Sequence, residues 1–514
     1  MSRVVSGIFW LLSRIVLSIV FYGTPLFGLW LASSLAAYLG GASWIPWVAG
    51  LLLFPLLPGL WEAHAYSHNR STKKPWFTPV DRVSLRTFAI GLVFIVGMLS
   101  IYPQTAFVAL STRGDWMLDG KKDKQSEKIR HDLFIAAGAV EWLYNATKTN
   151  PYKSQIDSQA REVAEEATKE RDKEAEQQRA KLAEKEAQQK GQSDQQSTSD
   201  EKLEKQLIDQ QEEASQVQKA LPKWPWKDAT IDPIVTKIPA EEETSIASVA
   251  HYIAEHETDP MLRVKALHDY VADRVAYDSE AFYSGNMPDQ SAEAVFENHK
   301  SVCAGYANLM SALGKACGEK IIVVVGDARD DKNGDKLSGY GHAWNAARIN
   351  NQWYLMDACW DAGYVSRERG FTKKYTTSYL LPPPEVMIQN HFPEDSSWQL
   401  LAKPLSQGEF LRQPMLAPDF QAAGLKLVAP RRSVNDVTAE AMTILKNPQK
   451  QWLMVALQQD GKPIGEKQTS DNESAQFVVP IPDKGTYRLN YYVSENKSEY
   501  ARYKGVGSVD FVNR

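Results

Sequence analysis

A cysteine, a histidine and an aspartate, which can work together in covalent catalysis, occur in the stretches "SVCAGYANLM" (301–310) and "GHAWNAARINNQWYLMDACW" (341–360). Cys303 stands where the first turn of a helix is predicted, because large apolar residues follow it at the three- and four-residue spacing of a buried helical face. We expect Ser301 to cap this helix. The positive end of the helix dipole favours a thiolate at this position. Cys303 can therefore act as a nucleophile if the chain also supplies a base.

The second stretch supplies a base and a group to hold it. Asn350-Asn351 lies between two β-prone runs and predicts a tight two-residue turn. With that turn, four side chains share one face of the predicted hairpin, in two opposing pairs: Trp344 with Asp357, and His342 with Cys359. His342 and Asp357 are then diagonal neighbours, close enough for their side chains to meet. Asp357 can hold one nitrogen of the imidazole and leave the other for the thiol.

A nucleophile, a base and an orienting carboxylate are what covalent acyl transfer needs. The thiolate would attack an amide carbonyl, the imidazolium would protonate the leaving amine, and the acyl-enzyme would pass to water or to another amine. The backbone N–H of Cys303 is placed to bind the oxyanion. Each residue also has a structural alternative: a small buried cysteine, a strand histidine in the core, and an aspartate at a turn or sheet edge.

The run Cys303-Ala-Gly-Tyr and the strands "GHAWN" and "WYLMDACW" resemble the three motifs of the transglutaminase-like superfamily. The resemblance implies an α+β, papain-like core with the cysteine helix packed on an antiparallel sheet. It also implies that Cys303 is the nucleophile, His342 the base and Asp357 the orienting carboxylate. It is nearest to the kyphoscoliosis-peptidase and cytokinesis-associated branch, in which a segment like 390–414 leads into a β-sandwich. It covers roughly residues 245–514.

Other residues have weaker assignments. Tyr277 is a candidate second oxyanion donor, as an upstream aromatic residue is in some relatives. Trp344 is expected to shield the site beside the base, with core packing as the equal alternative. Cys359 would face His342, where it could crowd the site or pair with Cys317 in the one disulfide that we consider.

We expect no metal and no cofactor. The loop "DARDDKNGDKLSGYG" (327–341) does not fit a calcium-binding loop, because Arg329 and Tyr340 would stand at ligand positions. We interpret it as a solvated loop at the mouth of the site. A net charge of −5 and the lack of a basic-aromatic patch argue against a nucleic-acid partner.

The first 110 residues predict a membrane unit of three spans, about 15–40, 43–61 and 87–110, each suited to a hydrocarbon core of about 30 Å. No ionisable residue lies within the core of a span, which favours an anchor over a transport pathway. The basic residues on the two sides nearly balance. The short loop 63–86 decides for an inside N-terminus and an extracytoplasmic C-terminal part, which would be periplasmic in a bacterium.

The remaining chain is segmented by composition. The segments predict a short helical subdomain (111–152), a charged helical or low-complexity spacer (153–220), a Pro-rich linker (221–242), the catalytic domain (243–400), and a linker with an immunoglobulin-like β-sandwich (401–514). The spacer has high helix propensity but no sustained heptad. We therefore favour a solvated spacer over a coiled-coil site for a partner, which stays open.

Together these patterns predict a membrane-anchored thiol enzyme whose catalytic domain stands off the membrane on the helical spacer. It would cleave or transfer amide bonds of extracytoplasmic peptides or proteins through a Cys303, His342 and Asp357 triad. The expected partners are the lipid bilayer and a peptide or protein substrate. The alternative is a non-catalytic, membrane-tethered scaffold or binding protein that uses the same module.

Overall fold

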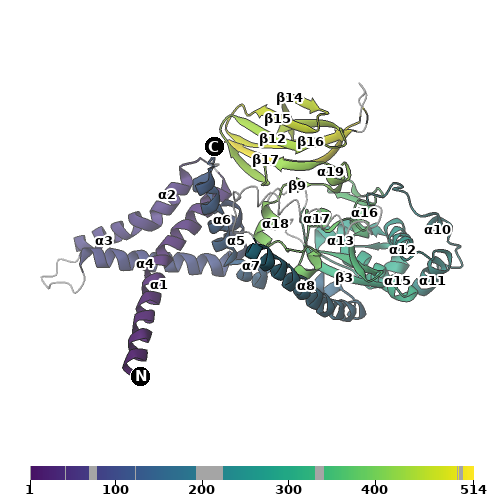
Figure 1. Ribbon diagram of the computed structural model, residues 1–514, viewed down its shortest axis with the longest axis horizontal. Helices are drawn as coiled ribbons and strands as arrows, with labels where there is room; N and C mark the ends of the chain where they lie inside the picture. Colours follow the sequence, from purple (N-terminus) through teal and green to yellow (C-terminus); the bar gives the residue numbers. More distant parts are fainter. Residues whose placement is uncertain are drawn as a thin grey trace.

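The computed structural model describes residues 2–40, 42–68, 78–121, 123–192, 224–329, 341–494, 496 and 502–513. N-terminal helices form one arm of the molecule, a mixed helix and sheet domain lies beside them, and a sheet-only domain lies over both (Figure 1). The fold is thus α+β with an additional C-terminal β-sandwich, as predicted.

Three helical stretches are long and apolar enough to cross a membrane: Arg14–Leu39, Ile45–Ser67 and Pro79–Ile101. They lie in the first helices of the chain, which are α1 (Ser2–Leu39), α2 (Ile45–Leu51), η1 (Leu52–Leu56), α3 (Leu57–His68) and α4 (Pro79–Ile101). The first two agree with the predicted spans. Which side of a membrane each end would face stays a prediction, and part of the basic loop at 69–77 lies outside the described residues.

The predicted bounds of the third span are wrong. Helix α4 begins earlier, because Thr78 and Asp81 form a capping box at its N-terminus. It ends at Ile101, before Pro103, which starts a separate helix. That helix, α5 (Pro103–Arg113), is buried by protein along most of its length. Its apolar residues join two clusters, one with the mixed domain and one with Leu31 of the first candidate span.

Helix α5 holds the rest of the protein close to the third span. Phe107 packs with Phe392 and Phe410 from the mixed domain in one apolar cluster. An ion pair of 2.6 Å joins Arg113 to Asp436 of the β-sandwich. The predicted stand-off on a spacer is therefore wrong, because α5 already docks both C-terminal domains. Short helices complete this region: η2 (Trp116–Leu118), α6 (Lys124–Gly138), α7 (Glu141–Thr147) and η3 (Lys153–Gln155).

The core of the mixed domain is a four-stranded antiparallel sheet in the order β5-β4-β3-β8. Its strands are β3 (Lys320–Ala328), β4 (Gly341–Ile349), β5 (Gln352–Met356) and β8 (His391–Pro393). The long helix α15 (Cys303–Cys317) packs on one face, and the start of α8 (Ser158–Gln192) with η5 (Ser396–Gln399) packs on the other. This is the predicted arrangement of a cysteine helix on an antiparallel sheet.

The predicted hairpin register is confirmed over β4 and β5, from Ile349 opposite Gln352 to Asn345 opposite Met356. It does not continue to the predicted pairs Trp344–Asp357 and His342–Cys359. Strand β5 ends at Met356, and the side chain of Asp357 caps a short helix, α16 (Ala358–Ala362). Cys359 therefore lies on a helix.

Smaller elements surround this core. Before the cysteine helix come α10 (Pro233–Thr236), α11 (Ile246–His256), α12 (Pro260–Arg274), β1 (Ala276–Tyr277), α13 (Ser279–Ser284), α14 (Ala292–Asn298) and β2 (Lys300–Ser301). After α16 come β6 (Gly363–Ser366), β7 (Gly370–Lys373), α17 (Pro384–Met387), α18 (Gln407–Arg412) and α19 (Pro418–Ala422).

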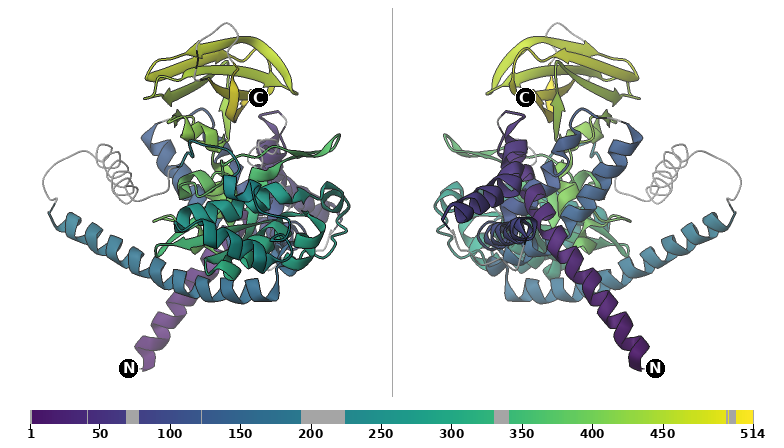
Figure 2. Two further views of the ribbon diagram at one scale, coloured as in Figure 1. Left: turned by 90° about the vertical axis from the view of Figure 1, so that its right-hand side faces the viewer. Right: turned by 90° about the vertical axis from the view of Figure 1, so that its left-hand side faces the viewer.

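The predicted spacer does not connect two domains. Its first turns belong to the mixed domain, since Ala160 and Ala167 are core residues of that domain. The ribbon of α8 then extends away from the rest of the molecule (Figure 2). Residues 193–223, which hold the low-complexity part, lie outside the described residues. At Trp226 the chain is back on the same domain, where the indole N–H donates to the carbonyl of Leu380 at 2.8 Å.

The C-terminal domain is a sandwich of two sheets around one apolar core. One sheet has the order β10-β12-β15, and the other has the order β11-β17-β16-β13-β14 with β9 beside β17. The strands are β9 (Met415–Leu416), β10 (Lys426–Ala429), β11 (Val434–Val437), β12 (Glu440–Lys446), β13 (Trp452–Gln459), β14 (Lys462–Ser470), β15 (Ser474–Pro480), β16 (Gly485–Ser494) and β17 (Lys504–Asn513).

Gly326 lies where β3 pairs with β8, and the close approach of the two strands predicts that this position does not tolerate a larger side chain. A Cβ on Gly326 would clash with the carbonyl oxygen of Phe392 and would lie 2.6 Å from the ring of Trp344. We expect Gly326→Ala to destabilise the full chain by about 1–3 kcal/mol, the usual cost of overpacking. The measurement is the midpoint of urea unfolding in detergent micelles, followed by tryptophan fluorescence.

Gly138→Ala is the matched control, because a Cβ there meets nothing within 4 Å. An unchanged midpoint for Gly326→Ala would contradict the close packing of β3 on β8.

Candidate active site

Cys303 is the first residue of α15 and is 1% exposed. The residue that precedes the helix and caps it is Val302, so the predicted capping role of Ser301 is wrong. Ser301 instead lies in β2, where its hydroxyl donates to the carbonyl of Val302 at 3.1 Å. A backbone N–H in the first turn has no partner within its own helix, which makes it available to an anion. Cys303 therefore lies at the N-terminal end of the helix, as predicted.

His342 and Asp357 are in contact, as predicted. The Nε2 atom of His342 lies 2.7 Å from Oδ2 of Asp357. Both side chains are buried, and the thiol of Cys303 is close enough to the same imidazole to raise its pKa. The pairing through Nε2 leaves Nδ1 for the thiol. The structure thus brings together the three residues to which the sequence assigned nucleophile, base and orienting carboxylate.

The charges in this cluster support one another. Burial disfavours the imidazolium of His342, but Asp357 and Cys303 outweigh it and raise the pKa of His342 to about 10. Burial likewise disfavours the carboxylate of Asp357, but His342 and His391 hold its pKa well below the usual range. A positively charged His342 beside an ionised Asp357 is therefore the stable arrangement at neutral pH.

His391 is a residue of this cluster that the sequence interpretation missed. Its Nε2 atom lies 2.9 Å from the same Oδ2 of Asp357. Burial lowers the pKa of His391 to about 4, so the ring is neutral. The only signal in the sequence was its place in the segment "NHFPEDSS", because a contact between an edge strand and a residue 34 positions earlier has no local pattern.

His342, Asp357 and His391 have the composition of a metal site, and their ligand atoms lie within 4.8 Å of one another. Both imidazole nitrogens, however, face one carboxylate oxygen at hydrogen-bonding distance. A metal ion would need the lone pairs of both nitrogens, whereas each now points an N–H at Asp357. We interpret the cluster as a hydrogen-bonded network.

Trp344 lies beside the base, as predicted. Its ring is stacked 5.9 Å from the ring of His342 and also contacts His391 at 5.1 Å. It is 1% exposed and belongs to the apolar cluster on the α8 face of the sheet. This placement suits a residue that packs against the two histidines and keeps water from them.

Two tyrosines border the thiol. Tyr277, the predicted oxyanion donor, ends strand β1 near Cys303, which together with burial raises the pKa of the phenol. Tyr152, which the sequence interpretation did not single out, is 1% exposed and also lies close to Cys303. Among the described residues its hydroxyl has no well-formed hydrogen bond. It is therefore a buried hydroxyl that lies close to both Tyr277 and the thiol.

Tyr152 belongs to a segment that covers the site, residues 150–157, which we call the strap. At its start, the amide of Asn150 donates to the carbonyls of Gly326 at 2.7 Å and His342 at 3.3 Å. At its end, the backbone N–H of Asp157 donates to the side chain of Asn308 at 3.1 Å. The strap is thus fastened to β3, β4 and α15, the elements that carry or adjoin the triad.

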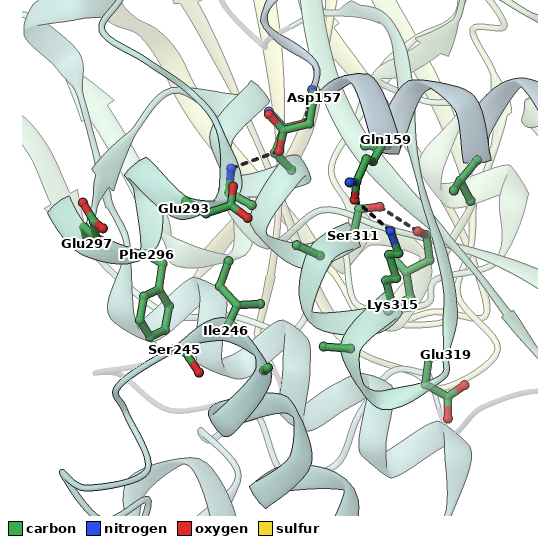
Figure 3. Close-up of a pocket in the computed structure, with 18 of the residues that line it drawn as sticks. Asp157, Gln159, Ser245, Ile246, Glu293, Phe296, Glu297, Ser311, Lys315 and Glu319 are labelled. Carbon is green, nitrogen blue, oxygen red and sulfur yellow. Dashed lines mark hydrogen bonds between the residues drawn. The ribbon is translucent and has the colours of Figure 1, made fainter.

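A hollow next to the strap lies beyond Asp157, between the first turns of α8 and α11, the helix α14 and the C-terminal half of α15 (Figure 3). Its volume is about 1200 Å³. Asp157 borders it and accepts a hydrogen bond of 3.0 Å from the backbone N–H of Ala292. Cys303, His342 and Asp357 are not among the residues that line it. The triad therefore lies outside this hollow.

The cysteines and the loop 327–341 need corrections. The three cysteines are free, so the considered Cys317–Cys359 disulfide is not formed. The loop was expected to be solvated, but Asp327 is buried against Lys148, and Arg329 is 0% exposed. Residues 330–340, which include Tyr340, lie outside the described residues.

The strap predicts that Tyr152 limits access to the nucleophile. We expect Tyr152→Ala to raise the rate at which iodoacetamide alkylates Cys303 by several-fold, because the side chain that covers the thiol is removed. The measurement is peptide mapping of the full chain in detergent, with the half-buried Cys317 as an internal reference. Tyr152→Phe keeps the ring and is expected to stay near the wild-type rate. Equal rates in Tyr152→Ala and wild type would show that the thiol is reached by another route.

Residues 247–358 match the family model of the transglutaminase-like superfamily. Kyphoscoliosis peptidase of Mus musculus is 26% identical over 258 residues, which cover 49% of this chain and 39% of that protein. Cytokinesis protein 3 of Schizosaccharomyces pombe (strain 972 / ATCC 24843) is 22% identical over 194 residues, which cover 37% of this chain and 22% of that protein. The chain thus spans well under half the length of these relatives.

Two solved structures are also similar in part. They are the periplasmic domain of TgpA from Pseudomonas aeruginosa bound to ethylmercury (20% identity, 24% of this chain and 47% of that one, TM-score 0.20) and a putative cysteine protease from Cytophaga hutchinsonii (21% identity, 30% and 50%, TM-score 0.19). TM-scores this low support no inference about this chain. The matched segment contains Cys303, His342 and Asp357 but not the strap or His391. The family resemblance of this chain therefore rests on residues 247–358, which are similar to the transglutaminase-like superfamily.

Proposed function

We propose that this protein is a membrane-anchored cysteine enzyme that breaks amide bonds through a thioester acyl-enzyme. The observation that carries the proposal is the buried contact between Nε2 of His342 and Oδ2 of Asp357, with Cys303 at the start of α15 beside the same imidazole. A nucleophile, a base and an orienter in this arrangement are what the chemistry needs.

The first half of the reaction forms the thioester. The thiolate of Cys303 attacks the amide carbonyl, and a bond from sulfur to carbon forms while the carbonyl electrons move to oxygen. The backbone N–H of Cys303 donates to that oxyanion, and the hydroxyls of Tyr152 and Tyr277 stand near it. His342 then gives its Nδ1 proton to the amine as the carbon–nitrogen bond breaks. The amine leaves, and the thioester remains on Cys303.

The second half releases the acyl group. Neutral His342 takes a proton from water or from a second amine, whose oxygen or nitrogen attacks the thioester carbonyl. The carbon–sulfur bond breaks, the acid or the new amide leaves, and the thiolate and imidazolium are restored. Asp357 keeps the imidazole oriented through both halves. Water is the acceptor that we favour slightly over an amine.

We base the proposed substrate class on the candidate membrane anchor. Three helices long and apolar enough to span a membrane precede the catalytic domain, and α5 docks that domain directly after the third. We propose that the substrates are peptides or proteins on the extracytoplasmic side, and periplasmic envelope components if the source is bacterial.

A scaffold function is the second candidate, and the covered nucleophile favours it. Cys303 is 1% exposed beneath the strap, as expected for a module that binds partners without catalysis. The intact triad favours the enzyme, because a scaffold does not need a charged histidine beside a buried carboxylate.

The test uses the full chain in detergent with a random-sequence peptide library and hydroxylamine as an added nucleophile. An enzyme is expected to give an acyl adduct on Cys303 by peptide mapping and to release hydroxamates. Cys303→Ala is expected to give neither product. His342→Ala is expected to slow hydroxamate release by about 10²–10⁴-fold, the contribution of a general acid-base.

Cys317→Ala is the matched control, since Cys317 lies at the far end of α15, and full activity is expected. Peptides that bind wild type and Cys303→Ala equally and give no hydroxamate would support the scaffold instead.

A further inference from the structure

The carboxylate of Asp357 has more partners than a triad requires. Oδ2 is shared by Nε2 of His342 at 2.7 Å and Nε2 of His391 at 2.9 Å. Oδ1 accepts the backbone N–H of Trp360 at 3.1 Å. The carboxylate, the two rings and their contacts are buried. Asp357 is therefore held from three directions, and one of them comes from a strand beyond the segment that matches the family.

The protonation of His391 follows from these contacts. A carboxylate only accepts, so Nε2 of His391 donates to it. As placed, the amide oxygen Oδ1 of Asn390 lies 2.9 Å from Nδ1, and the amide Nδ2 donates to the hydroxyl of Tyr379 at 2.6 Å. A neutral ring that donates through Nε2 needs a donor at Nδ1 instead. The amide of Asn390 provides this donor when it is turned by 180°, so that its NH₂ group faces the ring. This turn only exchanges the positions of the amide nitrogen and oxygen. The hydroxyl of Tyr379, at 2.6 Å from the same amide, can then donate to the amide oxygen.

We propose that His391 is a positioning residue of the active site, which holds Asp357 in the orientation that keeps His342 charged and aimed at Cys303. This inference rests on the proposed function. His391 touches neither the thiol nor the reacting carbonyl in the proposed reaction. It acts through Asp357 alone.

The surroundings of His391 make it a rigid support. Its backbone is paired with Ala328 in the sheet. Three aromatic rings surround its imidazole, with centroids at 5.1 Å for Trp344, 4.5 Å for Trp360 and 5.1 Å for Tyr379. The next residue, Phe392, belongs to one apolar cluster with Phe107 of α5. A ring held on all sides fixes the carboxylate that it contacts more firmly than a mobile side chain would.

Without the His391 donor, Oδ2 would have one partner, and the carboxylate could turn toward the N-terminus of α16. The bond from His342 would then be weaker. Since Asp357 and Cys303 are what raise the pKa of His342 against burial, a weaker contact with Asp357 lowers that pKa. The charged state of His342 would be lost at a lower pH.

The test measures how Cys303 reacts with iodoacetate across pH in the full chain in detergent, by peptide mapping. Iodoacetate is an anion, so it reacts faster while the neighbouring His342 carries its positive charge. The rate therefore falls as His342 loses its proton, near pH 10 in wild type. The titratable groups that face His342 are Cys303, Asp357 and His391.

In His391→Leu, which fills the space without a donor, we expect this fall to move down by about one pH unit or more. In His391→Gln, which keeps an N–H, we expect it to stay near the wild-type value. His251→Leu, at an exposed histidine of α11, is the control and is expected to match wild type. A purely structural role of His391 would change the amount of folded protein but not the position of the fall.

The outcomes separate the two proposals. A folded His391→Leu protein with the wild-type pH dependence overturns the positioning role and leaves the proposed function intact. A wild-type Cys303 whose reactivity does not change in His342→Ala overturns both. One equivalent of Zn²⁺ that copurifies with wild type and is lost in His391→Leu also overturns the positioning role, because the cluster is then a metal site.

Discussion

The buried carboxylate of Asp357 is the constraint on which the arrangement of the site depends. A carboxylate that is 1% exposed must be matched by protein donors, since water cannot reach it. Three elements meet at this one group: β4 brings His342, β8 brings His391, and α16 brings a backbone N–H. The end of β5 at Met356 follows from the same requirement, because Asp357 has to leave the strand to cap the helix.

A second set of contacts ties the site to the helices that follow the third candidate span. The strap joins α7 to α8. The side-chain amide of Asn150, at its start, donates hydrogen bonds to the carbonyls of Gly326 and His342. On the other side of β8, Phe392 packs on α5. The strand that carries His391 therefore lies between the active site and the helix that follows the third candidate span. Parts of the chain that lie outside the matched family segment complete a site that the family segment begins.

Much of this could be predicted from the sequence where the signal is local. The Asn350-Asn351 turn gave the correct register as far as Met356, and the contact between His342 and Asp357 was correct although Asp357 caps a helix. The helix position of Cys303 was also correct. Tyr152 and His391 could not be predicted, because each reaches the site through tertiary packing of a distant segment. The predicted separation of the catalytic domain from the membrane on a spacer was wrong for a similar reason. The sequence of an apolar helix such as α5 has the same pattern whether the helix lies in lipid or in a protein core.

Helix α5 begins at Pro103, and only Tyr102 separates it from Ile101, where the third candidate span ends. A rigid domain docked on that helix has little freedom to rise, tilt or turn relative to a bilayer. On the proposed anchoring, the nucleophile would work at one fixed height above the lipid surface. The protein would then select the bonds that it breaks by their distance from the bilayer and not only by the sequence around them. Bonds in molecules that lie closer or farther away would escape it, whatever residues surround them.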